Sequence, residues 1–328
     1  MEISKILSAE TGLPSSFFYL FSVRENYGFI TAVIADREGT AAVLKLTDSG
    51  IKEQISIYTL SQLRGISLSA DGTGLFCIGG RGSRSSTYYN LADGGTVPIN
   101  QTDTKEMIEI CSYNPVPGTD LLARAQWDSP DRMIIQFLSQ DEETGLYVPV
   151  PSVPELTSEY LISSIVWSPD GKRIIITSGD VDDGYKGTNG TAEIYEYDRS
   201  GSKKWECLYG NVFSQIIGNG CFSENGSIAA YNFDDKIRFI DTSKGTVLST
   251  KRKTLINDMA FYNSAGKDYL WYTRYSTVSC INLKNLKECF HLDFTEKIVN
   301  IKILSDDRLL CLFQSGEFAL YKIYPDRV

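Results

Sequence analysis

Residues with catalytic potential are few, because the chain has a single histidine. His291 stands between apolar residues in "CFHLDF", a stretch that we predict as an outer strand. Ser-His-Asp and Cys-His catalysis both need a base held against the nucleophile, and His291 is the sequence's one histidine base. We therefore expect no catalytic residue, and we interpret His291 as a packing residue at a strand edge.

An acidic segment offers oxygen ligands. "SGDVDDGYKGTNGTAE", residues 178–193, carries Asp180, Asp182 and Asp183 directly before a glycine. Carboxylates of this kind bind hard cations such as Ca²⁺, but the segment has no acidic residue at the position that closes a complete calcium loop. We interpret it as a solvated insertion, with a partner-binding loop and a cation site as the alternatives. No metal or other cofactor is expected.

A glycine-rich segment, "IGGRGSRS" at residues 78–85, has the composition of a phosphate-binding loop. Such loops place the phosphate at a helix N-terminus, whereas this segment follows one predicted strand and leads into another. We predict a connection between strands, with Arg81 and Arg84 projecting from it.

Composition and charge argue against a nucleic-acid-binding, membrane-bound or secreted protein. The 41 acidic and 32 basic residues give a net charge of −9, which repels nucleic acids and anionic membranes. The start "MEISKILSAETGLP" lacks signal-peptide features, and no apolar run reaches the roughly 18 residues of a membrane span, so we expect a cytoplasmic protein. The seven cysteines show no CxxC spacing and are expected to be reduced core residues.

One pattern recurs along the chain: an apolar strand, Ser or Asn, a turn of Asp, Asn and Gly, and a second apolar strand. "IVWSPDGKRIII", residues 165–176, is the clearest copy. Asp, Asn and Gly accept positive φ, and Pro presets the φ of its own position, so "SPDG" reverses two strands tightly. Further copies are "ISLSADGTGLFCI" from Ile66, "GCFSENGSIAAY" from Gly220, "MAFYNSAGKDYLWY" from Met259 and "IKILSDDRLLCLF" from Ile301.

Weaker copies, "FYLFSVRENYGFITAVI" from Phe18 and "IEICSYNPVPGTDLLA" from Ile108, complete a set of seven. The turns recur every 40 to 55 residues, which is typical of propeller blades. Their marker residues are Gly28, Gly72, Gly118, Gly171, Gly226, Gly266 and Asp307. We predict an all-β, seven-bladed β-propeller of four-stranded antiparallel blades, with residues 1–328 as a single domain.

The last predicted blade lacks a fourth strand, because the sequence ends after "EFALYKIYPDRV". The opening stretch "MEISKILSA" is strand-like and precedes the first strand of blade one. An open sheet edge invites aggregation. We predict that residues 2–8 pair with residues 317–322 and close the ring.

These turns resemble those of WD-repeat and WD-like β-propellers, and the resemblance covers essentially the whole chain. Its closest motifs are "SPDG" at Ser168 to Gly171 and "SADG" at Ser69 to Gly72, although TolB-like propellers also carry S-x-D-G hairpins. The family's Gly-His pair is absent, and Trp127-Asp128 ends a predicted second strand instead of a third. Without the histidine-centred hydrogen-bond network, the blades are expected to rely on apolar packing.

The resemblance implies a non-catalytic, monomeric scaffold that binds a protein or peptide. In a propeller, the connections between second and third strands share one face with those between blades, and the S-x-D-G turns lie on the other face. Arg and Tyr are over-represented among binding hot spots. The partner-binding candidates on the first face are Arg81, Arg84, Asp128, Arg132, Asp180, Asp182, Asp183, Arg274 and Tyr275, with Asp131 in the connection of blade three and Asp234 and Asp235 in that of blade five.

A propeller enzyme is the alternative, most plausibly a lactonase-like hydrolase acting on a small sugar acid. Arg and carboxylate groups converging on the channel would favour the enzyme. A channel mouth lined by aromatic and mixed charged residues would favour the scaffold.

Overall fold

Tight turns with left-handed backbone define the architecture. In the computed structural model, Gly72, Gly118, Gly171, Gly226 and Gly266 have φ between 66° and 76°, and Asp307 has φ 56°. Each of these residues joins the first and second strands of its sheet, as the sequence predicts. The seventh marker, Gly28, lies outside the described residues.

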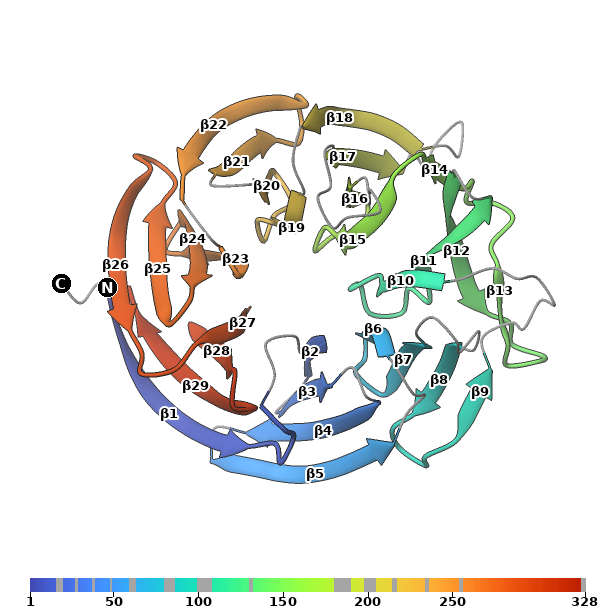
Figure 1. Cartoon of the computed structure of the whole chain (residues 1–328), viewed down its shortest axis with the longest axis horizontal. Coiled ribbons are helices and arrows are strands. Elements are labelled where there is room, and N and C mark those ends of the chain that lie inside the picture. The colour runs from blue at the N-terminus through green and yellow to red at the C-terminus, as the bar shows by residue number, and fades with distance from the viewer. Residues whose placement is uncertain are drawn as a thin grey trace. The chain divides into compact units, whose positions relative to one another are not determined.

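The structure describes residues 1–15, 20–26, 29–36, 39–47, 49–58, 63–79, 86–98, 108–129, 132–179, 190–197, 205–213, 217–233, 236–253 and 256–325. Within these ranges, the strands form seven antiparallel sheets (Figure 1). The chain divides into two compact units, one of Met1–Tyr58 with Lys251–Val328 and one of Thr59–Thr250.

The first unit holds three sheets, each with four strands in the order given. One sheet consists of β2 (Leu20–Asn26), β3 (Phe29–Ala35), β4 (Thr40–Thr47) and β5 (Gly50–Tyr58). The second consists of β23 (Asp258–Ser264), β24 (Lys267–Arg274), β25 (Thr277–Asn282) and β26 (Lys287–Asp293). The third consists of β27 (Ile298–Leu304), β28 (Arg308–Phe313), β29 (Glu317–Tyr324) and β1 (Glu2–Glu10).

The second unit contributes the other four sheets. The first has β6 (Leu63–Leu68), β7 (Gly74–Gly79), β8 (Ser86–Asn90) and β9 (Thr96–Pro98); the second has β10 (Ile108–Tyr113), β11 (Leu122–Ser129), β12 (Arg132–Gln140), β13 (Tyr147–Pro149) and β14 (Leu156–Ser158). The third has β15 (Leu161–Trp167), β16 (Arg173–Gly179), β17 (Gly190–Tyr197) and β18 (Trp205–Phe213); the fourth has β19 (Ile217–Phe222), β20 (Ile228–Phe233), β21 (Lys236–Asp241) and β22 (Thr246–Arg252).

Seven sheets of this topology are the blades of a seven-bladed β-propeller, so the predicted fold class is confirmed. One blade differs in detail from the predicted four strands. Beside β12, the fourth position is filled by two three-residue strands, β13 and β14, which both pair with β12. The third position of the seven sheets is occupied by β4, β8, β12, β17, β21, β25 and β29.

The first strand of the chain completes the last blade, as predicted. Glu2 pairs with Tyr324 and Glu10 with Glu317, so β1 and β29 lie side by side in antiparallel register (Figure 1). The register shifts between Lys5 and Leu7. Ile3 packs on one core of the unit, whereas Ile6 and Leu7 pack on another. The strand therefore both covers the edge of β29 and buries apolar surface.

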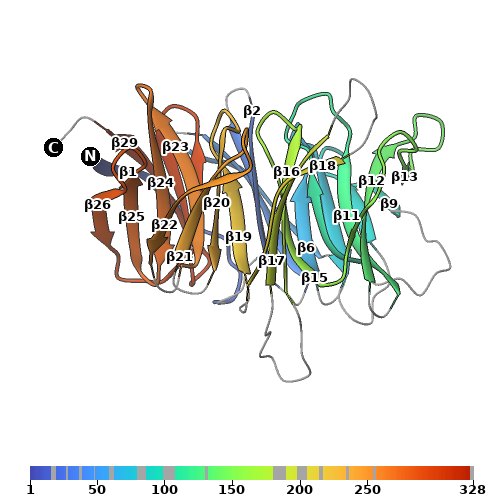
Figure 2. The ribbon, with the colours of Figure 1, turned by 90° about the horizontal axis from the view of Figure 1, so that it is seen from above.

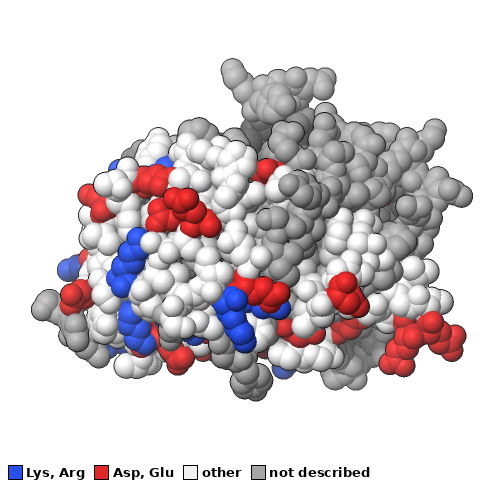
Figure 3. Space-filling model, turned by 90° about the horizontal axis from the view of Figure 1, so that it is seen from below, with Lys and Arg blue, Asp and Glu red and all other residues white. Residues whose placement is uncertain are grey.

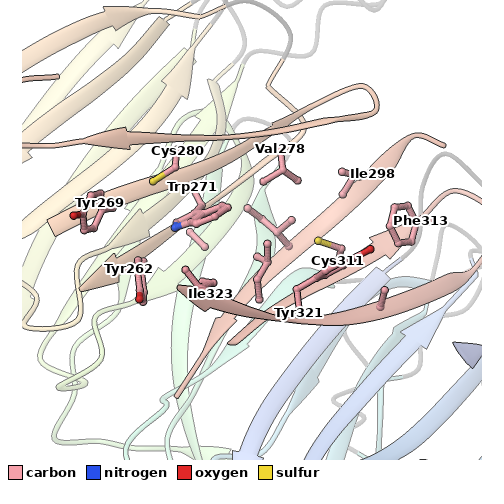
Figure 4. Close-up of a cluster of buried hydrophobic side chains, with 14 residues drawn as sticks. Tyr262, Tyr269, Trp271, Val278, Cys280, Ile298, Cys311, Phe313, Tyr321 and Ile323 are labelled. Carbon is pink, nitrogen blue, oxygen red and sulfur yellow. The ribbon is translucent and has the colours of Figure 1, made fainter. Parts of the chain in front are cut away.

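Apolar faces of neighbouring blades form the cores. In the first unit, Trp271 of β24 is fully buried and packs among residues of the β23–β26 and β27–β29 blades, including Tyr262, Cys311 and Tyr321 (Figure 4). The continuous apolar runs of the middle strands explain this burial, because both faces of each middle strand are covered. Burying such side chains contributes roughly 1.5–3 kcal/mol each.

Polar contacts also join neighbouring blades, in addition to the apolar packing that the sequence predicts. Oδ2 of the buried Asp258 accepts hydrogen bonds from the backbone amide of Ile301 at 2.9 Å and from the Asn300 side chain at 3.3 Å. The Tyr262 hydroxyl donates to Asp307 at 2.6 Å. Buried polar groups need such partners, so they fix the register of one blade against the next.

Candidate protein interface

The turn between β24 and β25 presents an exposed tyrosine in a strained conformation. The middle residues of β24 are buried, and Arg274 at its end is exposed. Arg274 pairs with Thr277, so Tyr275 and Ser276 form the turn. Tyr275 has φ 51° and is 53% exposed. A bulky residue with positive φ is strained by about 1–3 kcal/mol, and such strain clusters at binding sites.

Backbone contacts hold this turn against the connection that follows the blade. The carbonyl of Tyr275 accepts a hydrogen bond from the amide of Ile298, and that of Ser276 accepts one from the amide of Phe294, both at 2.8 Å. Because these bonds engage the backbone, the side chain of Tyr275 stays at the surface beside Arg274. The turn is therefore a rigid platform with an aromatic and a basic side chain.

Acidic groups lie close to this turn. The Thr277 hydroxyl donates to the exposed carboxylate of Asp293 at 2.7 Å, and this hydrogen bond lowers the pKa of Asp293 below its usual value. β24, β25 and β26 run side by side in Figure 2, so Asp293 at the end of β26 belongs to the same end of the blade as Tyr275. Figure 3 draws the side of the molecule seen from below Figure 1, and blue basic and red acidic side chains are interspersed among its described residues.

The second candidate pair lies in the turn between β11 and β12. Ser129 pairs with Arg132, and the register shifts between Trp127 and Ser129. The Arg132 Nε donates to Asp128 Oδ2 at 2.7 Å, and Nη2 of the same guanidinium donates to the same oxygen. The structure thus brings two predicted interface residues together as an exposed ion pair, which by itself stabilises the fold little. Trp127-Asp128 ends a second strand, as the sequence predicts.

Both turns occupy the position that the sequence predicts for a partner. Each connects the second and third strands of its own blade, and each therefore lies at the end of the sheet opposite to the S-x-D-G type of turn. The two turns belong to different units of the chain. The other candidates, Arg81, Arg84, Asp180, Asp182 and Asp183, lie outside the described residues, as do Asp131, Asp234 and Asp235.

The single histidine lies on the predicted outer strand, β26, but it is exposed and not packed. Its Nδ1 is 3.2 Å from the Ser279 hydroxyl oxygen, and its Nε2 is 3.5 Å from Asp293 Oδ2. Ser279 is only 3% exposed. The three groups thus resemble a triad in type, but the serine is covered and not presented to a substrate.

The cysteines differ in burial, which corrects the expectation of core residues throughout. All seven are free thiols. Cys77, Cys111, Cys280 and Cys311 are buried and Cys221 is half-buried, whereas Cys207 and Cys289 are exposed on outer strands. The sequence signal for the exposure of Cys207 and Cys289 is the polar neighbours in "KWECL" and "LKECFHLD". Polar residues are typical of an outer strand, because no further strand covers it.

Among the described residues, no group of three or more His, Cys, Asp and Glu side chains is arranged to hold a metal ion. No helix in the same part of the chain is long and apolar enough to cross a membrane.

Comparison with known proteins agrees with the fold. No family model matches the sequence, and no curated protein matches it. Among solved structures, the β-propeller domain of Myceliophteria thermophila Cps50 (Swd1) is similar, with a TM-score of 0.65 and 15% sequence identity over 98% of this chain and 100% of that chain. At this identity the likeness shows the fold alone, and it agrees with the predicted β-propeller.

Proposed function

We propose that this chain is a non-catalytic interaction scaffold that binds a protein or peptide through the connections between the second and third strands of its blades. The observation that carries this proposal is Tyr275, which is held at φ 51° with its side chain 53% exposed beside Arg274. Evolution toward stability alone would favour Gly or Asn at such a position. Tyr and Arg are the side chains that contribute most to protein interfaces.

The electrostatic setting supports a protein or peptide partner over other ligands. A net charge of −9 opposes nucleic-acid backbones and anionic membranes, and Asp128, Arg132, Arg274 and Asp293 give the two described turns both signs of charge. We further propose that the protein works in the cytoplasm as a single-domain monomer without a cofactor.

Affinity purification from the native cell tests this role. The tagged wild-type chain is compared with the Arg81→Glu/Arg274→Glu variant, and Lys267→Glu and Glu224→Lys serve as matched charge reversals in turns of the S-x-D-G type. We expect the double variant to lose the co-purifying proteins while its circular dichroism and melting stay unchanged, and both controls to retain them. Recovery of the same partners by the double variant would show that these connections are not the docking surface.

A further inference from the structure

The outer strand β26 carries its exposed cysteine at a β-bulge. Cys280 of β25 pairs with Phe290, and the next residue, Ile281, pairs with Glu288, so Cys289 is the extra residue of β26. In a bulge, two residues of one strand face a single residue of its neighbour. Cys289 and Phe290 therefore both face Cys280, and the bulge brings two cysteines of adjacent strands together.

The two thiols are in contact but lie in different surroundings. The Cys289 Sγ donates to the backbone carbonyl of Cys280 at 3.5 Å, so the two residues are in contact. Cys280 is fully buried across from Trp271, as Figure 4 shows, whereas Cys289 is exposed. An accessible thiol beside a second, resolving thiol is the arrangement of redox-sensing cysteines.

Ionisation strengthens the contrast between them. The hydrogen bond from Cys280 is the largest cause that lowers the pKa of Cys289 to about 7, whereas burial raises the pKa of Cys280 well above its usual value. The thiolate is the nucleophilic form of cysteine. Cys207, the other exposed cysteine, differs, because partial burial and the nearby Glu193 raise its pKa.

We propose that Cys289 is a peroxide-reactive thiol and that Cys280 resolves its oxidised form into a disulfide. The Cys289 thiolate attacks one oxygen of hydrogen peroxide, the O–O bond breaks, and the departing hydroxide takes up a proton to give water and a sulfenic acid. The Cys280 sulfur then attacks the Cys289 sulfur, the S–O bond breaks, and the hydroxyl leaves as water with the proton of the Cys280 thiol. Two thiols lose two electrons, and peroxide is reduced to two waters.

Strand geometry permits this bond. Neighbouring strands lie about 4.7–4.9 Å apart, and the Cα atoms of a disulfide lie about 4.4–6.8 Å apart, so the pair can close without separation of β25 from β26. Closure would tie the outer strand of the blade covalently to its third strand.

Alkylation with iodoacetamide tests the reactive thiol, with Cys207 as an exposed control in the same molecule. We expect the alkylation rate at Cys289 to rise with pH, with a midpoint near pH 7. At neutral pH this rate should exceed the rate at Cys207 by roughly fivefold or more, because a lower pKa increases the thiolate fraction more than it weakens the nucleophile. Equal rates at the two positions would overturn the assignment of Cys289.

Peroxide treatment followed by peptide mass spectrometry tests the resolving step. Wild type should yield a peptide pair joined at Cys280 and Cys289. Cys280→Ser should instead accumulate a dimedone-trapped sulfenic acid at Cys289, and Cys289→Ser should give neither product. A wild-type protein that forms no such cross-link, or a Cys280→Ser variant labelled at Cys207 as strongly as at Cys289, would contradict the proposal.

Discussion

The Asn114 side chain donates a hydrogen bond to the backbone carbonyl of Gly171 at 3.0 Å, although 57 residues separate the two in sequence. Asn114 is fully buried, and its Oδ1 accepts the amide of Val116 at 3.0 Å. The "SPDG" turn of one blade is thereby fastened to the neighbouring blade of the same unit. Glycine is needed at residue 171 for two reasons. Its φ of 66° is unfavourable for other residues, and the Asn114 side chain leaves no space for a Cβ.

Replacing Gly171 with Ala should therefore cost more than the same change at Gly118. A Cβ at residue 171 would clash with Asn114 Oδ1, whereas a Cβ at residue 118, at φ 76°, meets nothing within 4 Å. We expect Gly118→Ala to lower the free energy of unfolding by about 1 kcal/mol from backbone strain alone. Gly171→Ala should lower it by about 1–3 kcal/mol more, as the buried hydrogen bond is lost. Equal losses in urea unfolding would mean that the Asn114 contact contributes nothing.

Deleting residues 1–9 should destabilise the protein and promote its association. The deletion uncovers the edge of β29 and removes the packing of Ile3, Ile6 and Leu7. We expect the melting temperature to fall by at least about 5 °C, since each kcal/mol corresponds to about 2–4 °C in a protein of this size. Ser4→Ala, which removes only an exposed hydrogen bond to Tyr324, should melt like wild type. A truncated protein that stays monomeric and equally stable would refute closure by this strand.

Asp258 and Asp293, which both belong to the β23–β26 blade, should show opposite pH dependence. Burial raises the pKa of Asp258 above its usual value, so its contribution to stability is lost as pH rises from about 4 through the folded-state pKa. The hydrogen bond from Thr277 lowers the pKa of Asp293, so that contribution is present above about pH 4 and is lost as pH falls.

Urea unfolding between pH 3 and 7 checks this contrast with two Asn variants. Relative to wild type, Asp258→Asn should become more stable as pH rises, and Asp293→Asn should become less stable. The opposite result would be an Asp258→Asn variant that becomes less stable than wild type as pH rises. It would mean that the three hydrogen-bond donors to the Asp258 carboxylate stabilise the charged form more than burial destabilises it.

The strain at Tyr275 predicts a trade between stability and binding. Asn tolerates positive φ, so Tyr275→Asn should raise the free energy of unfolding by about 1 kcal/mol while it weakens partner binding. Thermal melting and a binding isotherm measure the two effects on the same sample. A variant that binds as wild type, or that melts lower, would mean that the tyrosine serves the fold and not a partner.

The blades are predictable from sequence because their signals are local. "SPDG" reverses the chain through its own φ preferences. The continuous apolar runs on either side of it predict strands that are buried on both faces. The pairing of residues 2–8 with 317–322 is also predictable, since a propeller with an incomplete last blade has one unpaired edge to fill. Among the described residues, the split fourth strand of the β10–β14 blade is the feature that this reasoning does not predict.

The candidate interface is less predictable, because its properties depend on distant residues. Tyr275 is identifiable as a turn residue, but its strained backbone depends on a hydrogen bond to Ile298 of the next blade. Asp128 and Arg132 are identifiable singly, while their pairing follows from a register shift that no sequence motif marks. Cys289 faces Cys280 only because of a bulge in β26. Regular strand alternation in "LKECFHLD" would not predict that the two cysteines meet.

We propose that the Arg274–Tyr275 turn binds the partner, and β24 itself supplies the sharpest control. Arg274 and Lys267 are exposed basic residues at opposite ends of this strand, so their charge reversals change the net charge equally. The measurement is the Kd of a co-purifying partner for Arg274→Glu and for Lys267→Glu. We predict that Arg274→Glu weakens binding about 30-fold or more, the equivalent of about 2 kcal/mol at a hot spot, while Lys267→Glu binds within about twofold of wild type. Equal Kd values for the two variants would contradict the claim.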